Sequence, residues 1–461
     1  MTMLLPLLGS APSEAAPRNV RIAIILYNFR DDTSAPTSRN QVEHVVFTRN
    51  AAATQAGGSV NAYYREVTNG DIQFSGDVFG WYTLDRSVLG DDDRTYACPP
   101  PGEDARIENP LYDDVHDAAA VDGFDPSGYD VVIYASNQGI CSGWIYGNRI
   151  TINANNDGLW IVLVHELGHL LGLEHANVAE NCTTPSGTKV PWSATCTVRQ
   201  YGDGFSTMGW SWGLGHLSGI DKLRLGSWQL GTDVVDASRP GRYVIRPVTA
   251  PSGVRGLRIP TSTNADRGPR PFFSGVDPDM AYYIEYRTPT GYNQYTQDIE
   301  PRSGNRGVYV RIGSDPRHRQ LPMLLDMDPG HDSWAMEAGR WYDDPQQGVS
   351  FRVVPNSLRH DQATIEVRAL TPPAPLSVQL HCESGELLCD AFASGGSGRY
   401  SYTWSTTSAS INRQVDSGSV STIVGRCTRH GSTYGARVTV RDSAGASVTR
   451  RATRSCAGIF F

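Results

Sequence analysis

An eleven-residue stretch, His165 to His175, constrains this chain more than any other segment. It reads HELGHLLGLEH and directly follows the apolar run 159–164. If the stretch begins on a helix, His165 and His169 project from one face, about 6 Å apart along the axis. Gly172 can adopt the positive φ that ends a helix and turns the chain sharply. The spacing therefore predicts that His175 returns toward the two helical histidines.

Three neutral imidazoles with one open position are the donor set of a catalytic zinc ion, whereas a structural zinc site is closed by four protein ligands. Other divalent ions fit the same ligands. Glu166, between the two helical histidines, is placed to act as a general base rather than to bind the metal. The alternative is a helix whose histidines are ordinary polar groups. With this composition, however, the full HExxHxxGxxH pattern arises by chance in roughly two of a hundred thousand such sequences.

These residues resemble the metzincins, zinc endopeptidases defined by this motif and by a methionine turn beneath the metal. The segment YGDGFSTMG supplies a candidate turn, with Met208 lying 33 residues after His175. Tyr-Gly-Asp before Met-Gly, and GHLSGIDKLRLGSW after it, look most like the gametolysin family. The resemblance covers roughly residues 18 to 235. It implies Zn²⁺ bound by His165, His169 and His175, with Glu166 as general base and Met208 as a hydrophobic floor.

Other positions near the motif have alternative interpretations. Astacins and serralysins carry a tyrosine two residues after the methionine, but this chain has Trp210, so the resemblance identifies no oxyanion stabiliser. His216 is expected to be structural, or to support a ligand, rather than to be a fourth ligand. In metzincins an edge strand pairs with the extended substrate, so the resemblance implies that residues 143–152 line the cleft. An ordinary strand without substrate contact is the alternative.

The region before the motif alternates between strand and helix patterns, which predicts a parallel α/β layer. Apolar, β-branched runs at 20–29 and 129–136 are typical of buried strands. Further strands are predicted at 72–76, 78–84 and 143–154, the last broken by Gly147 and nearer a sheet edge because its polarity alternates. Helices are predicted within 37–56, at 59–70, and from 107 to 119. Asn155, Asn156 and Asp157 suit the cap of the helix that carries the motif.

From about residue 236 the pattern changes to short strands separated by Gly, Pro, Asp and Asn, which is typical of β-sandwiches. Residues 371–375, TPPAP, read as a proline-rich hinge. The last segment resembles the immunoglobulin-like or polycystic-kidney-type domains appended to secreted bacterial enzymes, with Trp404 in its core. We therefore predict a multidomain α+β protein with four parts. They are a residual signal or expression-derived segment at 1–17, a metzincin-like zinc protease domain at 18–235, a β-sandwich accessory domain at 236–370 and an immunoglobulin-like domain at 376–461.

Eight cysteines without any CxxC spacing favour disulfides and an oxidising compartment, so we expect a secreted, extracellular protein. The first four fall into local pairs, whereas the last four allow three pairings. In that last domain we favour the pairing that joins the inner strands and the outer strands of a sandwich. The predicted bonds are Cys98–Cys141, Cys182–Cys196, Cys389–Cys427 and Cys382–Cys456.

Composition restricts the partners. The net charge is −8 and the basic residues are dispersed, so nucleic acid is not an expected partner. No apolar run is long enough to cross a membrane, and we expect a monomer. Calcium is conceivable at a few acidic positions, but their spacing matches no EF-hand loop, and turn carboxylates are the favoured interpretation. These positions are Asp277, Asp279, Asp326 and Asp328.

These features together predict a secreted zinc-dependent endopeptidase that hydrolyses internal peptide bonds of extracellular proteins or glycoproteins. A zinc-activated water attacks the scissile carbonyl while Glu166 accepts its proton. The alternative from another class is a binding or adhesion protein, in which the β-sandwich domains attach to a cell wall or matrix and carry the main role. A third alternative, a deacetylase or another hydrolase, keeps the metal and changes the reaction.

Overall fold

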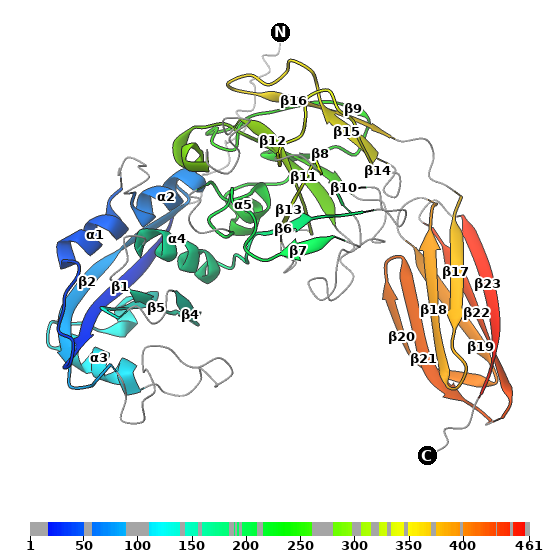
Figure 1. Ribbon diagram of the computed structural model, residues 1–461, viewed down its shortest axis with the longest axis horizontal. Coiled ribbons are helices and arrows are strands. Elements are labelled where there is room, and N and C mark those ends of the chain that lie inside the picture. Colours follow the sequence, from blue (N-terminus) through cyan, green and yellow to red (C-terminus); the bar gives the residue numbers. More distant parts are fainter. Residues whose placement is uncertain are drawn as a thin grey trace, which may run out of the picture. The chain divides into compact units, whose positions relative to one another are not determined.

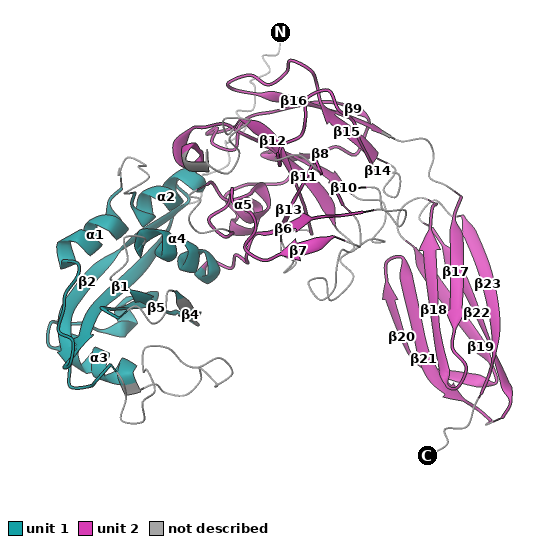
Figure 2. Cartoon of the chain, viewed as in Figure 1, with its two compact units in different colours: residues 1–170 teal, residues 171–461 magenta. Residues whose placement is uncertain are grey.

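The computed structural model divides into two compact units, residues 1–170 and 171–461 (Figure 2). The residues that it describes are 17–49, 58–88, 110–138, 143–154, 159–183, 189, 191–192, 196–209, 215–260, 280–296, 306–314, 322–329, 333–344, 349–369, 375–396, 400–429, 431–442 and 446–456.

Unit 1 is built on a five-stranded sheet in the order β2-β1-β3-β5-β4 (Figure 1). The strands β1, β2, β3 and β5 run parallel, and β4 is antiparallel to β5 at the edge. β1 has a neighbour on each side and buries both faces, as its continuous apolar run predicts. The strands are β1 (Arg18–Phe29), β2 (Ile72–Leu84), β3 (Val131–Ser136), β4 (Trp144–Tyr146) and β5 (Arg149–Asn153).

Helices cover both faces of this sheet. They are α1 (Arg39–Phe47), α2 (Val60–Val67), α3 (Pro110–Ala120) and α4 (Leu159–Leu170). Alternate residues of a strand point to opposite faces, so Ala23 and Ile25 of β1 share one core with Leu111 and Val115 of α3. In Figure 1, α1, α2 and α4 lie on the other side of the sheet from α3. The predicted parallel α/β layer is therefore present in unit 1.

The prediction of separate strands at 72–76 and 78–84 is wrong, because β2 is one strand across both segments. Gly76 ends the first predicted strand but lies inside β2, as does Gly80, and their φ angles are +152° and +87°. A Cβ on Gly76 would lie 1.8 Å from the Ile22 carbonyl oxygen, and one on Gly80 would lie 2.3 Å from that of Leu26. Both glycines permit close approach to β1 without ending the strand.

Residues 143–154 form a hairpin, with the break at the predicted Gly147. The chain turns at Gly147 and Asn148, which separate β4 from β5. Only β4 lies at the sheet edge, because β5 pairs with β3 on its other side. The predicted edge position thus holds for β4 and not for β5.

Unit 2 begins with a seven-stranded sheet in the order β7-β6-β13-β12-β11-β10-β8. Strands β6 and β7 come from the predicted protease domain, β8 lies across the predicted boundary, and the other four come from the predicted accessory domain. The boundary expected at residue 235 lies within β8, so it does not separate two sheets. These strands are β6 (Asn177–Glu180), β7 (Thr197–Arg199), β8 (Val234–Asp236), β10 (Gly256–Pro260), β11 (Ala281–Arg287), β12 (Gly307–Gly313) and β13 (Met323–Leu325).

A four-stranded sheet packs against this one through a shared core. Ile245, Phe351 and Ile365 from the second sheet contact the same cluster as Leu257 and Val310 from the first. The short helix α5 (Gly219–Leu225) ends at Gly226, whose φ is +80°. The second sheet has the order β14-β15-β16-β9, with β9 (Gly241–Ile245), β14 (Tyr342–Asp344), β15 (Val349–Val353) and β16 (Ala363–Ala369).

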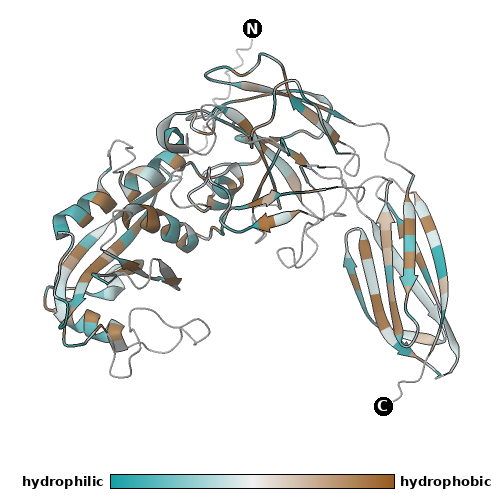
Figure 3. Cartoon of the chain, in the orientation of Figure 1, coloured by the Kyte–Doolittle hydropathy of each residue, from teal (hydrophilic) through white to brown (hydrophobic). Residues whose placement is uncertain are grey.

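The C-terminal part is a sandwich of two antiparallel sheets with its own core. Figure 3 shows hydrophobic and hydrophilic residues alternating along its strands, as one buried face requires. Trp404 is buried there and its Nε1 donates to Ser421 Oγ at 2.7 Å, which confirms its predicted core position. The sheets are β17 (Ser377–Cys382), β18 (Leu387–Ser394), β21 (Val420–Cys427) and β20 (Ala409–Ser417), and β19 (Ser401–Thr407), β22 (Thr433–Arg441) and β23 (Ser447–Ser455).

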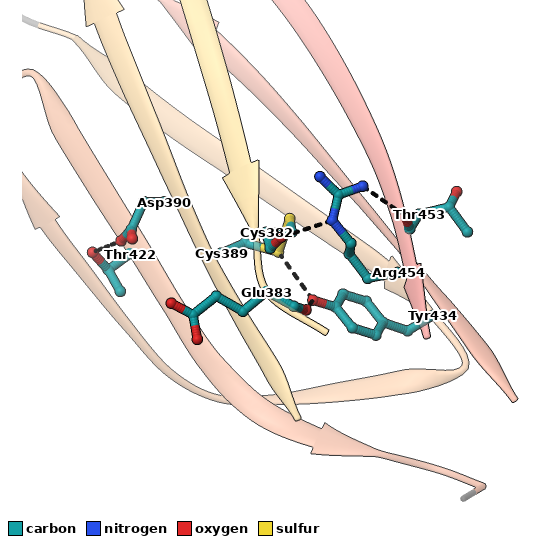
Figure 4. The surroundings of a disulfide bond; sticks show 8 residues. All are labelled: Cys382, Glu383, Cys389, Asp390, Thr422, Tyr434, Thr453 and Arg454. Atoms are coloured by element: carbon teal, nitrogen blue, oxygen red, sulfur yellow. Dashed lines mark hydrogen bonds between the residues drawn. A yellow bond between two sulfur atoms is a disulfide. The ribbon is translucent and has the colours of Figure 1, made fainter. Parts of the chain in front are cut away.

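The disulfides correct two predicted bonds. Cys182–Cys196 is present, whereas the C-terminal pairs are Cys382–Cys389 and Cys427–Cys456. Cys382 and Cys389 are directly opposite in the β17–β18 hairpin, a register that the assumed pairing of inner and outer strands overlooked. Figure 4 shows the Cys382 carbonyl accepting from Arg454 Nε at 2.8 Å. The predicted bond Cys98–Cys141 lies outside the described residues.

The predicted multidomain α+β protein with β-sandwich parts is confirmed in this coarse form. Three disulfides within the described chain are consistent with an extracellular protein. Among the described residues, no helix has both the length and the apolar character needed to span a membrane.

Candidate metal centre

Helix α4 carries the first half of the motif in a buried setting. His165 is 7% exposed and Glu166 is 8% exposed. The Nε2 atoms of His165 and His169 lie 3.1 Å apart, with the two rings nearly perpendicular at 83°. Tyr64 of α2 donates its hydroxyl to the Val164 carbonyl at 2.7 Å, which ties the helix to its neighbour just before the motif. Both histidines are therefore held by a packed helix, as the i, i+4 spacing predicts.

Gly172 supplies the predicted turn after the helix. Its φ is +94°, and a Cβ there would meet no atom within 4 Å. Glycine is therefore favoured at this position by the backbone conformation rather than by lack of space. After this turn, His175 joins the other two histidines, and one ligand nitrogen from each residue lies within 4.8 Å of the others. Among the described residues, this is the only group of three or more His, Cys, Asp or Glu side chains arranged in this way.

The spacing of the two helical histidines is that of two ligands on a tetrahedral divalent metal. Zinc binds imidazole nitrogen at about 2.0–2.1 Å, which corresponds to about 3.3 Å between two tetrahedral nitrogens. The 3.1 Å between His165 Nε2 and His169 Nε2 is close to this value. Within the described part of the chain no cysteine or fourth histidine joins this group, and three imidazoles are a donor set typical of catalytic rather than structural zinc.

Glu166 faces the backbone of Gly143, next to the edge strand β4. A Cβ on Gly143 would lie 2.2 Å from Glu166 Oε1, and the φ of this glycine is +84°. Burial raises the pKa of the Glu166 carboxyl to about 7. A carboxyl with a pKa near neutrality can both accept and return a proton, which suits a general acid–base. The segment predicted to line the cleft thus approaches the predicted base at Gly143.

Tyr201 is a site neighbour that the sequence did not identify. Its ring lies against His175, with 3.8 Å between the ring centroids and a tilt of 38°. The backbone of Tyr201 has a φ of +56°, unusual for a residue with a side chain, and its N–H donates to Asn177 Oδ1 at 3.0 Å. The side chain remains 43% exposed. The only signal in the sequence was its place in the Tyr-Gly-Asp segment, which carries no role by itself.

Residues 202–209 form a buried loop that contains Met208, here called the methionine loop, and this loop is hydrogen-bonded to Ala176, the residue after His175. The Met208 carbonyl accepts from the Ala176 N–H at 2.8 Å, and the Asp203 N–H donates to the Ala176 carbonyl at 3.2 Å. A Cβ on Gly209 would lie 2.1 Å from the Asp203 carbonyl oxygen, so the Met-Gly pair needs its glycine. Met208 is 0% exposed. Trp210, at the position of the metzincin tyrosine, lies outside the described residues.

Buried charges connect this loop to the seven-stranded sheet. Arg311 of β12 donates through Nε to Asp203 at 2.7 Å and also pairs with Glu285 of β11. Arg287 of β11 donates to Glu285 at 2.7 Å and to the Phe205 carbonyl at 2.6 Å. Burial alone would raise the pKa of Glu285, but the two arginines outweigh it and hold that pKa at about 2. Contacts among these four charged side chains, together with the Phe205 carbonyl, therefore fix the methionine loop to strands that follow it by 82 to 108 residues.

His216 belongs to this buried region and not to the histidine group. Lys222 donates to the Nδ1 atom of His216 at 2.9 Å, and the His216 carbonyl accepts from Arg287.

Two of the four acidic candidates for calcium binding lie within the described residues. Asp326 accepts from the Asp328 N–H at 3.1 Å in a turn, Asp328 pairs with Arg340 at 2.6 Å, and Asp277 and Asp279 lie outside the described residues.

No protein-family model matches this chain. A comparison with curated proteins found no relative either.

Proposed function

We propose that this protein is a secreted zinc-dependent endopeptidase that acts on extracellular proteins or glycoproteins. The observation that supports it is the convergence of His165, His169 and His175, with the buried Glu166 between two of them on the same helix. The resemblance to metzincins supports the same reading. When bound, zinc would polarise the scissile carbonyl and lower the pKa of water from about 15.7 toward 7.

In this proposal the protein's own groups bind the substrate and move the proton. Within the described residues β4 is hydrogen-bonded only to β5, so its other edge can pair with an extended peptide through backbone hydrogen bonds. A peptide paired with β4 would pass next to the Glu166 carboxylate, because Gly143, directly before β4, lies against that carboxylate. Glu166 takes a proton from the attacking water and later gives it to the leaving amine. The same carboxyl group therefore carries the proton from the water to the amine and ends as a carboxylate again.

The test combines metal analysis of the full chain with cleavage of casein, with and without a chelator. We expect one zinc per chain and internal cleavage that the chelator abolishes. Glu166→Ala should retain zinc and lose turnover, whereas His169→Ala should lose both. The control His381→Ala changes an exposed histidine of β17 and should lose neither. Near-normal activity in Glu166→Ala, or full zinc in His169→Ala, would defeat the assignment.

A further inference from the structure

The C-terminal domain carries a charge opposite to that of the whole chain. Residues 376–461 contain nine arginines, no lysine and five acidic residues, a net charge of +4, whereas the full chain carries −8. The domain is net positive because it contains few acidic residues. Arginine binds carboxylate and sulfate groups through two parallel hydrogen bonds, which a lysine cannot do.

Three of these arginines lie on the outer face of the β19–β22–β23 sheet. Ala436, Val438 and Val440 of β22 are buried in the core, so the alternate residues Arg437 and Arg441 point outward. The register places Arg451 of β23 directly opposite Arg437. Directly opposite residues of β19, β22 and β23 form rows across this face, and four rows contain Gly435, Arg437, Thr439 and Arg441 of β22. The other outward residues in these rows are small and mostly hydroxylated: Ser401, Thr403, Ser405, Thr407, Gly435, Thr439, Ser447, Thr449 and Thr453.

The arrangement of the arginines is unfavourable in the free protein. Directly opposite residues in an antiparallel pair have Cβ atoms about 4.5–5.5 Å apart, and like charges at that distance destabilise the sheet. Arg437, Arg441 and Arg451 are exposed, and within the described residues none of them forms an ion pair. The four rows of this face contain no Asp or Glu. An anionic group bound between Arg437 and Arg451 would remove their repulsion.

The surrounding side chains fit a sugar polymer better than other polyanions. Hydroxyl groups on both sides of the arginines can donate to and accept from sugar hydroxyls, and Thr439 and Thr449 already pair at 2.8 Å. These rows present no aromatic ring on which a nucleic-acid base could stack, and no large apolar side chain that could enter a lipid layer. Arg441 lies four residues from Arg437 along β22, about 13 Å at the usual rise of a strand, so successive charges of a polymer can bind.

We propose that the outer face of the β19–β22–β23 sheet binds an acidic polysaccharide, a polymer with carboxylate or sulfate groups, through Arg437, Arg441 and Arg451. The surface lies entirely within the C-terminal sandwich and does not depend on the metal centre. It would hold the protein on an anionic matrix.

The test uses the full chain with two probes, heparin for sulfate and polygalacturonate for carboxylate, and measures Kd over a series of NaCl concentrations. The variant R437Q/R451Q should bind at least one probe at least tenfold more weakly than the unchanged protein. The slope of log Kd against log salt concentration should also be smaller for this variant, by about one for each lost arginine. The matched control R413Q/R426Q removes two exposed arginines from the other sheet of the same domain and should bind like the unchanged protein. Because all four side chains are exposed, both variants should keep their Tm.

Three results would overturn the proposal. One is the absence of binding to either probe by the unchanged protein at low salt. Another is equal weakening in R437Q/R451Q and R413Q/R426Q, which would indicate only nonspecific attraction to the domain's net charge. The third is tighter binding, through Arg437 and Arg451, to single-stranded DNA or to vesicles containing phosphatidylserine than to either polysaccharide, which would assign the face to a different class of partner.

Discussion

Replacing Glu285 with glutamine should destabilise the sheet that holds the methionine loop. Glu285 is 4% exposed and accepts from Arg287, Arg311 and the Gly219 N–H. Its pKa is about 2, compared with 4.5 for an ordinary glutamate. This difference corresponds to about 3 kcal/mol of stabilisation by the charged form. The value lies at the lower end of the roughly 3–5 kcal/mol lost when one member of a buried ion pair is removed.

The assay is hydrogen exchange read by mass spectrometry on peptides from β11 and β12. A loss of about 3 kcal/mol corresponds to exchange through local opening that is roughly 100-fold faster. The matched control is Glu366→Gln, which removes a carboxylate bonded to Arg352 at 2.7 Å on a more exposed part of the second sheet. A pair this exposed contributes much less than a buried one, because water and salt screen its charges. Comparable effects of the two substitutions on their own strands would refute the reasoning.

The pH dependence of the unfolding free energy tests the same charge on Glu285. Because folding lowers the pKa of Glu285, its charge stabilises the folded protein above about pH 4.5, and this stabilisation is lost as the pH falls toward about 2. The difference in unfolding free energy between the unchanged protein and Glu285→Gln should therefore shrink as the pH falls through this window. A difference that stays constant from pH 6 to pH 3 would contradict the assigned charge.

Two further predictions concern the site and its support. Gly143→Ala places a Cβ in contact with the Glu166 carboxylate and should lower kcat/KM for casein about 100-fold while zinc remains bound. The control Gly147→Ala also lies at positive φ, but its new Cβ has no atom within 4 Å, so it should lower only the stability of the protein. Equal activity in the two variants would contradict the contact. A fragment of residues 18–235 lacks β10 to β13, so its second half should not fold and the fragment should not keep zinc. A fragment of residues 18–370 should fold and keep zinc. If the fragment 18–235 binds zinc and resists proteolysis, the later strands are dispensable.

The fold could be predicted from sequence where its signals are local. The buried strand β1, the helix α4 and the turn at Gly172 depend on side-chain periodicity and on backbone freedom within a few residues. Prediction failed where the meaning of a residue depends on a partner far along the chain. Gly76 suggests a strand end by itself, but contact with β1 makes it a close-approach position inside a strand. Cys389 likewise finds its partner through the hairpin register.

The candidate site shows the same division. The sequence alone determined that His165, Glu166 and His169 share a helix and that the chain turns before His175, because eleven consecutive residues fix these relations through helix geometry and one glycine. Only the tertiary structure brought Tyr201 against His175, placed Gly143 beside Glu166, and joined Arg311 to both Asp203 and Glu285. Those contacts join residues 23 to 108 positions apart. No local pattern encodes them, because they arise from the order and register in which the strands pair.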